Sequence, residues 1–276
     1  MRSETIGPAT IHHGEALDFL QGLEPGTVDA FITDPPYSSG GAFRGDRVDT
    51  TQRKYLASAS GNLAKTADFS GDNRDQRSFA YWSALWASAA LRAAKPGAPA
   101  LFFTDWRQLP TSTDYLQAGG WVWRGVVPWV KRSPRPQVGR FTSAAEYVVW
   151  GSAGPMPIER GVGCLPGFYE VPADGLGERM PSHWDHASPQ DREHVTQKPV
   201  SLMADMCRIV EPGGLICDPF AGSGSTGVAA VQLGYRVLLC EADLHHFDMT
   251  CRRIERAVNA GALFAQAEPV QGVIEA

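Results

Sequence analysis

A short polar motif at the end of a hydrophobic run is the first feature of this sequence that could do chemistry. Residues 31–41 read FITDPPYSSGG, so a carboxylate, two prolines and a tyrosine directly follow a strand-like stretch. Pro35 and Pro36 fix the backbone and carry no N–H group, which leaves the Asp34 carboxylate and the Pro35 carbonyl as acceptors. Two acceptors suit an amino group with two hydrogens, and Tyr37 offers a flat ring for stacking on a planar base. Taken alone, the motif is better explained as a stiff turn.

A glycine-rich loop in the C-terminal part of the chain is typical of nucleotide-type ligands. Residues 214–243, GLICDPFAGSGSTGVAAVQLGYRVLLCEAD, run from an apolar strand through Gly222, Gly224 and Gly227 into a helix and a second strand. The glycines let a ligand approach the backbone closely, and Glu241 at the next strand end can accept hydrogen bonds from ribose hydroxyls. No lysine follows the glycines, so this is not a Walker loop. The loop alone leaves open a nicotinamide cofactor, S-adenosylmethionine, or a tight turn without a ligand.

Asp218 distinguishes between these ligands. A carboxylate directly before the glycines would repel a pyrophosphate, whereas it could bind the ammonium of an amino-acid moiety directly or through water. S-adenosylmethionine carries such an ammonium together with a ribose. Asp34 and Asp218 both follow strands, and open sheets bind ligands at the carboxyl ends of their strands. We therefore expect Asp34 and Gly222 to be neighbours, which would place a methyl donor beside an acceptor.

The alternation of strands and helices predicts how these loops are held. Apolar β-type runs bounded by turn signals lie at residues 28–34, 99–105, 121–130, 145–151, 214–220 and 235–241. Apolar residues at helical spacing occur at residues 16–23, 79–94, 199–210 and 245–258. This alternation predicts an α/β fold with a doubly wound, mainly parallel sheet.

Two long polar segments interrupt the alternation within what we interpret as a single domain, residues 1–276. Residues 38–77 are rich in Gly, Ser, Asp and Arg, and residues 151–193 are rich in Gly and Pro. Both are too long for ordinary connections, which indicates functional insertions or structural loops.

Composition places the chain among globular proteins, with 276 residues of which 43% are hydrophobic. No run of about 18 apolar residues occurs and the first residues lack the pattern of a secretion signal, so we expect a cytoplasmic protein without a membrane span. The cysteines form no C-x-x-C pair, which favours buried thiols over disulfides or a metal site. His245 and His246 have no apparent third ligand nearby, so no metal is expected there either.

A basic segment stands out against the overall negative charge. The net charge of −5 and the pI near 5.8 argue against a surface coated uniformly with positive charge. Residues 124–140 nevertheless contain no acid, and their basic side chains are Arg124, Lys131, Arg132, Arg135 and Arg140. The segment could contact phosphates, or it could be a solvated loop.

Together these motifs resemble those of the amino-directed DNA methyltransferases, which methylate adenine N6 or cytosine N4. In that family DPPY is the catalytic motif and DPFAGSG the cofactor loop, and here the catalytic motif comes first, as in the permuted β class. The likeness covers residues 9–41 and 194–256 and is weak between them. It implies a Rossmann-like, S-adenosylmethionine-dependent methyltransferase fold with a seven-stranded type of sheet and inserted recognition loops.

The resemblance assigns roles to residues at matching positions. The residues that hold the base would be Asp34, Pro35, Pro36 and Tyr37. The residues that line the cofactor would be Glu15, Asp34, Lys198, Asp218, Phe220, Ala221, Gly222, Ser223, Gly224, Glu241 and Asp243. The chain departs from the family at two places. Glu15 stands where an Asp usually reaches the cofactor's adenine, and HHF at residues 245–247 stands where a Tyr is common.

The implied activity is site-specific methylation of a flipped-out base in double-stranded DNA, with S-adenosylmethionine as donor and no metal. Asp as the first residue of the tetrad favours adenine N6 over cytosine N4. The basic segment would contact phosphates, and residues 38–77 or 151–193 would recognise the target. A homodimer and a cognate restriction enzyme are candidate partners. A nicotinamide-dependent dehydrogenase and a non-catalytic DNA-binding module remain as alternatives from other classes.

Overall fold

The computed structural model describes residues 2–37, 74–131, 138–139, 141–171 and 198–266, and its centre is one sheet. Nine strands of this part of the chain pair in the order β1-β2-β9-β8-β3-β4-β6-β5-β7. The strands are β1 (Arg2–Ile6), β2 (Ala9–His13), β3 (Ala30–Thr33), β4 (Pro99–Thr104), β5 (Val122–Lys131), β6 (Ala145–Ser152), β7 (Tyr169–Val171), β8 (Leu215–Asp218) and β9 (Arg236–Glu241). The strands from β2 to β4 in this order are parallel, whereas β1 and β6 run antiparallel to their neighbours.

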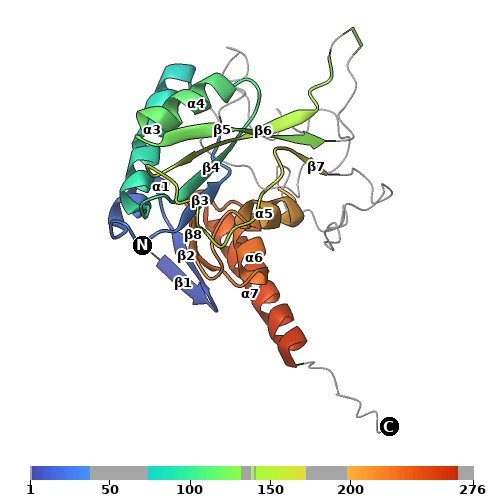
Figure 1. The fold of residues 1–276 in the computed structure, drawn as a ribbon. Coiled ribbons are helices and arrows are strands. Elements are labelled where there is room, and N and C mark those ends of the chain that lie inside the picture. Colours follow the sequence, from blue (N-terminus) through green and yellow to red (C-terminus); the bar gives the residue numbers. More distant parts are fainter. Residues whose placement is uncertain (1, 38–73, 132–137, 140, 172–197, 267–276) are drawn as a thin grey trace.

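Helices cover both faces of the sheet (Figure 1). One face carries α1 (Ala16–Gly22), α3 (Gln76–Ala93) and α4 (Leu109–Ala118), and the other carries α5 (Val200–Cys207), α6 (Ser225–Gln232) and α7 (Leu244–Gln266). Because both faces are covered, every residue of β3 and β4 is buried, which explains their continuous apolar sequences. The N-terminus of α3 is capped by Asp75, whose side chain accepts the Ser78 N–H at 2.9 Å.

The middle of the sheet is a topological switch point. β3 and β8 are direct neighbours, with Ala30 paired to Ile216 and Phe31 to Cys217. The chain crosses from β3 through α3 to β4, and from β8 through α6 to β9, so the two crossovers leave in opposite directions over opposite faces. The carboxyl ends of these two strands therefore border the crevice in which open α/β sheets bind ligands.

The predicted doubly wound, mainly parallel sheet is confirmed, and all six predicted strands form. β1, β2 and β7 were not predicted, and they extend the sheet beyond the seven-stranded type. Sequence periodicity also missed α4, whose first turns are dominated by Pro, Thr and Ser. It forms because Tyr115 and Leu116 are buried and the Ser112 hydroxyl donates to Thr104 Oγ1 at 2.8 Å.

Most of the two predicted insertions lies outside the described residues, namely residues 38–73 of the first and 172–193 of the second. Their described ends join regular structure, because residues 76–77 begin α3 and residues 151–152 end β6. Cys207, Cys217 and Cys240 are buried, as predicted, whereas Cys164 is exposed and Cys251 is only partly buried. Within the described ranges, no helix has the length and apolar character needed to cross a membrane.

Candidate active site

Three neighbouring parallel strands end in an aspartate at one edge of the sheet. Asp218 closes β8, Asp34 follows β3 and Asp105 follows β4. The strand that leads into DPPY thus lies beside the strand that leads into the glycine-rich loop, as predicted. A hydrogen bond of 2.6 Å from the Thr33 hydroxyl to Asp218 Oδ1 joins the two strand ends.

Asp34 forms a compact cluster with Tyr37 and Lys198. The Tyr37 hydroxyl donates to Asp34 Oδ1 at 2.7 Å, and Lys198 Nζ donates to Asp34 Oδ2 at 2.6 Å. Nζ also donates to the Tyr37 hydroxyl at 2.7 Å and lies 5.4 Å from the centroid of the Phe103 ring. The predicted role of Lys198 at the cofactor stays a prediction. Its ammonium lies at DPPY, because Lys198, two residues before α5, packs against Phe103 near the end of β4.

A second carboxylate, Glu146 of β6, extends this cluster. Its Oε2 lies 3.3 Å from Lys198 Nζ, and its Oε1 accepts a hydrogen bond from Lys131 Nζ. The side chain of Lys198 is only 6% exposed and that of Glu146 only 19%. Lys131, Glu146, Lys198 and Asp34 thus form a row in which cations and anions alternate. Sequence analysis did not single out Glu146, and its one signal is a charge inside the apolar run AEYVVWG.

Burial and pairing shift the pKa values within this cluster in different directions. Burial raises the pKa of Asp34, and the adjacent Lys198 ammonium and Tyr37 hydroxyl offset only part of that effect. Burial alone would lower the pKa of Lys198, but Asp34 and Glu146 outweigh it and raise that pKa. Burial would raise the pKa of Glu146, but Lys198 and Lys131 outweigh it and lower that pKa. Lys198 and Glu146 are therefore both charged at neutral pH.

Asp218 lies at its predicted place but does not present a free carboxylate. It is 1% exposed, and its Oδ1 accepts the Thr33 hydroxyl and the Phe220 N–H, the latter at 3.0 Å. Its Oδ2 accepts the Thr226 hydroxyl at 2.6 Å. The predicted binding of an ammonium group by Asp218, directly or through water, stays a prediction. In this structure its carboxylate fixes the loop from β8 to α6, and burial raises its pKa to about 6.

The glycine-rich loop leaves room for a ligand. Gly222 and Gly224 have φ values of +54° and +80°, which side chains rarely adopt. A Cβ at Gly222 would meet no heavy atom within 4 Å, so the backbone here faces open space. Glu241 borders the same place, because its Oε2 accepts the Gly222 N–H at 2.7 Å and its Oε1 the Asp243 N–H at 2.9 Å. Burial raises the pKa of Glu241 to about 7.

Other predicted cofactor residues connect this loop to the helices that pack against it. Ala221 and Ser223 are buried, and the Ser223 carbonyl accepts a hydrogen bond from Arg253 of α7. The half-buried Phe220 ring packs against Trp82 and Trp86 of α3, with centroids 5.5 and 5.2 Å away. These contacts hold the loop rigidly between α3 and α7, which a preformed ligand site requires.

Glu15 and Asp243 lie near Glu241 but have different surroundings. Glu15 follows β2, whose His13 pairs with Glu241, and its side chain is exposed at the start of α1. It can therefore reach a ligand lying along this edge. Asp243 Oδ1 accepts the His246 N–H at 2.9 Å at the start of α7, so it helps to begin that helix. The described residues contain no group of three His, Cys, Asp or Glu side chains that could hold a metal.

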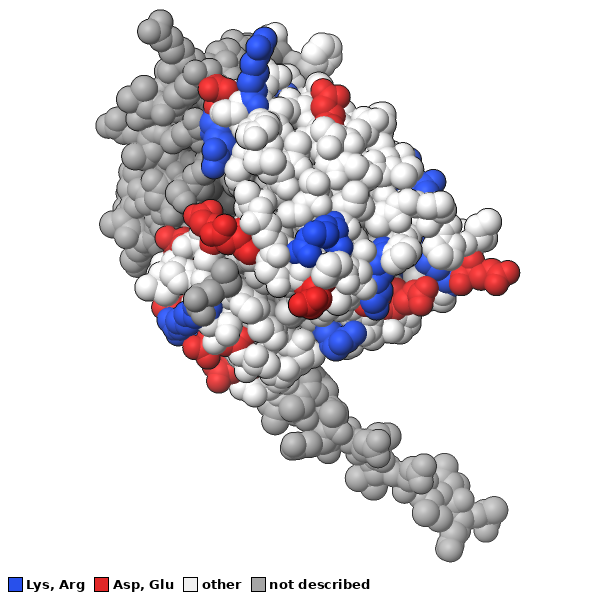
Figure 2. Space-filling view, turned by 90° about the vertical axis from the view of Figure 1, so that its left-hand side faces the viewer, with Lys and Arg blue, Asp and Glu red and all other residues white. Residues whose placement is uncertain are grey.

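The structure divides the predicted basic segment. Arg124 lies near the start of β5 and is pinned to the Ser152 hydroxyl at 2.9 Å and the Gly154 carbonyl at 3.2 Å. Lys131 lies at the other end of β5, about 23 Å away at the usual rise per residue. Arg124 is therefore at the edge opposite the Asp34 cluster, while Arg132, Arg135 and Arg140 lie outside the described residues. The face shown in Figure 2 mixes basic and acidic side chains, so its described surface carries no continuous basic stripe.

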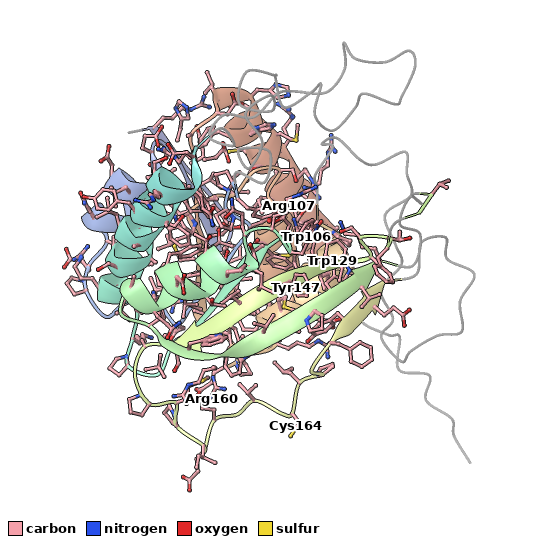
Figure 3. The ribbon with its side chains drawn as sticks, turned by 90° about the horizontal axis from the view of Figure 1, so that it is seen from above. Trp106, Arg107, Trp129, Tyr147, Arg160 and Cys164 are labelled. Atoms are coloured by element: carbon pink, nitrogen blue, oxygen red, sulfur yellow. The ribbon has the colours of Figure 1, made fainter. Side chains whose placement is uncertain are left out.

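The turn after β4 has no role among the predictions from the sequence. Trp106 is 54% exposed there, and the Arg107 guanidinium lies 5.1 Å from the Trp106 ring centroid. Asp105 fixes the turn by accepting the N–H groups of Arg107 and Gln108, each at 3.0 Å. In Figure 3, Trp106 and Arg107 are seen together at this edge, away from Cys164. The sequence feature that could have indicated this turn is the Thr-Asp pair, which occurs at the ends of both β3 and β4.

Comparisons with known proteins bear on this arrangement. A family model described as "DNA methylase" matches residues 28–252. The chain is 24% identical over 257 residues to the Type II methyltransferase M2.DpnII of Streptococcus pneumoniae, covering 88% of each protein. It is 23% identical over 261 residues to the Type II methyltransferase M2.MboI of Moraxella bovis, covering 88% of this chain and 86% of that protein.

Solved structures show the same fold. The M1.HpyAVI complex with S-adenosylmethionine superposes with a TM-score of 0.58 and 20% identity, covering 89% of this chain and 98% of that one. The cytosine-N4-specific PvuII DNA methyltransferase gives a TM-score of 0.62 at 15% identity, covering 96% and 95%. At these identities the likeness establishes the fold that the chains share.

Proposed function

Because this chain belongs to the DNA methylase family, whose model matches residues 28–252, we propose that it methylates the N6 amino group of an adenine flipped out of double-stranded DNA. One observation carries the proposal. The acceptor motif Asp34–Tyr37 and the open glycine-rich loop at Gly222 lie at the ends of the adjacent strands β3 and β8. A target base and a cofactor bound at these places would meet at one edge of the sheet.

The glycine-rich loop fits S-adenosylmethionine. Open space at Gly222 admits a ligand against the backbone, and the Glu241 carboxylate beside it suits ribose hydroxyls. Glu15 would reach the far end of such a ligand, and Phe220, which packs against Trp82 of α3, would line its side. When bound, S-adenosylmethionine supplies an electrophilic methyl group on its sulfonium.

The residues of DPPY account for the acceptor side of the reaction. The Asp34 carboxylate and the Pro35 carbonyl would accept both hydrogens of the amine and stabilise the positive charge that develops on its nitrogen. To do so, Asp34 exchanges part of its bonding to Tyr37 and Lys198 for the incoming amine. The Tyr37 ring takes over stacking that the base loses on leaving the duplex. Fixing amine and methyl in attack geometry contributes on the order of 7 kcal/mol or more.

The finer assignments are part of the same proposal. The order of the motifs supports the permuted β class, and Asp34 as first residue of the tetrad favours adenine over cytosine. Trp106, Arg107 and Lys131 border the Asp34 edge and would contact DNA there, joined by Arg132, Arg135 and Arg140. The two relatives described above are Type II methyltransferases, which supports a cognate restriction enzyme and a cytoplasmic location for this chain. A homodimer would enlarge the short recognition surface.

Methyl transfer to DNA tests the proposed function directly. Unmethylated genomic DNA is incubated with labelled S-adenosylmethionine, and the product nucleosides are separated by mass spectrometry. We expect label in N6-methyladenine. Label in N4-methylcytosine would agree with the proposed mechanism but show that the target base is cytosine. Bound cofactor without any label in DNA would contradict the proposed function itself.

Cofactor affinity is expected to depend on pH through Glu241. Its pKa is about 7, because burial outweighs the N–H groups of Asp243 and Gly222 that stabilise the carboxylate. A carboxylate accepts hydrogen bonds from ribose better than a carboxylic acid does, so binding favours the ionised form. The dissociation constant for S-adenosylmethionine should therefore rise about tenfold from pH 8 to pH 6, measured by calorimetry. Glu241→Gln should bind more weakly, with a flat pH profile. An equally steep profile in this variant would contradict the assignment.

A further inference from the structure

The ammonium of Lys198 is shared between two carboxylates. Lys198 Nζ donates to Asp34 at 2.6 Å and to the Tyr37 hydroxyl at 2.7 Å, and it forms an ion pair with Glu146 Oε2 at 3.3 Å. Its side chain is 6% exposed, so water cannot replace a partner that is lost. The position of this buried charge is thus set by the protein groups around it.

Glu146 is held in place by the sheet. It lies on β6 opposite Trp129 of β5, and its other oxygen is bonded to Lys131 of that same strand. The neighbouring β4 carries Phe103, whose ring lies under the Lys198 ammonium. Glu146 therefore offers Lys198 a rigid anionic partner that is separate from DPPY. The lowered pKa of Glu146 and the raised pKa of Lys198 agree with a charged pair.

Without Glu146, Asp34 would be the only carboxylate partner of Lys198 among the residues that the structure describes. A carboxylate held closely by an unshared, buried ammonium is a weaker acceptor for an amine that is itself becoming positive. The Asp34 carboxylate would also be pulled toward Lys198 and away from the geometry that the amine needs. Small misplacements in an active site lower the reaction rate considerably.

We propose that Glu146 is a positioning residue for methyl transfer, which holds Lys198 so that Asp34 stays oriented and available to the target amine. This inference rests on the proposed function, because it concerns the same acceptor site. Glu146 contacts neither reactant in this account and acts only through Lys198. Its charge matters more than its shape.

Two substitutions separate charge from shape. Glu146→Gln keeps the size and removes the charge, whereas Glu146→Asp keeps the charge on a shorter side chain. Glu255→Gln, an exposed change on α7, is the matched control. For each protein we would measure kcat and KM for methyl transfer into unmethylated genomic DNA. Calorimetric affinity for S-adenosylmethionine and the melting temperature would be measured on the same samples.

We expect Glu146→Gln to lower kcat by about 30-fold or more, with the KM and the affinity for S-adenosylmethionine within about threefold of wild type. Glu146→Asp should stay within about fivefold of wild type in kcat, and Glu255→Gln should match wild type. A Gln variant as active as the Asp variant would overturn the inference, because shape would then suffice. If Glu146→Gln does not fold, a 30-fold loss of kcat in a folded Glu146→Asp variant would overturn the inference equally. Wild-type protein that binds cofactor but methylates no DNA would contradict the proposed function instead.

Discussion

Asp34→Asn should lower the rate of methyl transfer by about 10³-fold while S-adenosylmethionine still binds. The substitution preserves the size of the side chain but replaces one acceptor oxygen with an NH₂ group. The NH₂ group cannot accept a hydrogen bond from the target amine. A neutral amide also does not stabilise the positive charge that develops on the amine nitrogen. Cofactor affinity should change less than about threefold, because Gly222 and Glu241 form a separate part of the site.

The fold should survive this change. Lys198 loses its bond of 2.6 Å to Asp34 but keeps Glu146 and the Tyr37 hydroxyl, so the buried ammonium is not left unpaired. Single-turnover transfer of labelled methyl groups would give the rate, and calorimetry the affinity. Asp114→Asn, the same chemical change at an exposed position of α4, is the control and should be as active as wild type. A rate within tenfold of wild type for Asp34→Asn would show that another group accepts the amine.

The sequence predicted the parts of the fold that depend on local patterns. β3, β4, β8 and β9 are short apolar runs bounded by turn residues, and the glycines that follow β8 indicate a turn into a helix. Adjacency of β3 and β8 also followed, because ligand-binding loops gather at the switch point of such sheets. α4 was missed because its Pro, Thr and Ser residues hide its pattern, and packing of Tyr115 and Leu116 stabilises it instead.

The side-chain pairing inside the site could not be predicted in the same way. Sequence analysis assigned Asp218 to the cofactor because a carboxylate precedes the glycines, but the donors that surround it come from two other places, Thr33 on β3 and Thr226 on α6. Lys198 likewise meets Glu146 of β6 only through the folded sheet. Such pairs join segments far apart in the chain, so no local motif contains them.

The strongest structural consequence of this pairing is expected at Asp218. Asp218→Ala would leave the Thr33 and Thr226 hydroxyls and the Phe220 N–H without their acceptor in a buried place. An unsatisfied buried donor costs about 1–3 kcal/mol, so the free energy of unfolding should fall by about 3 kcal/mol or more. Because the loop would lose its anchor, the affinity for S-adenosylmethionine should fall about 100-fold. Urea denaturation and calorimetry would measure the two losses.

Asp218→Asn should destabilise the protein far less than Asp218→Ala. Its amide oxygen can still accept hydrogen bonds from Thr33 and Phe220, and its NH₂ group can donate to the Thr226 hydroxyl. The pKa of Asp218 is about 6, raised by burial, so the folded protein holds this proton more tightly than the unfolded chain does. This group therefore makes wild type less stable as pH rises from about 4 to about 6, whereas a neutral Asn is unaffected. The stability of Asp218→Asn relative to wild type should accordingly improve between pH 4.5 and pH 7. If Asn were as damaging as Ala at pH 7, the negative charge itself would be what the loop requires, and the hydrogen-bonding account of Asp218 would be wrong.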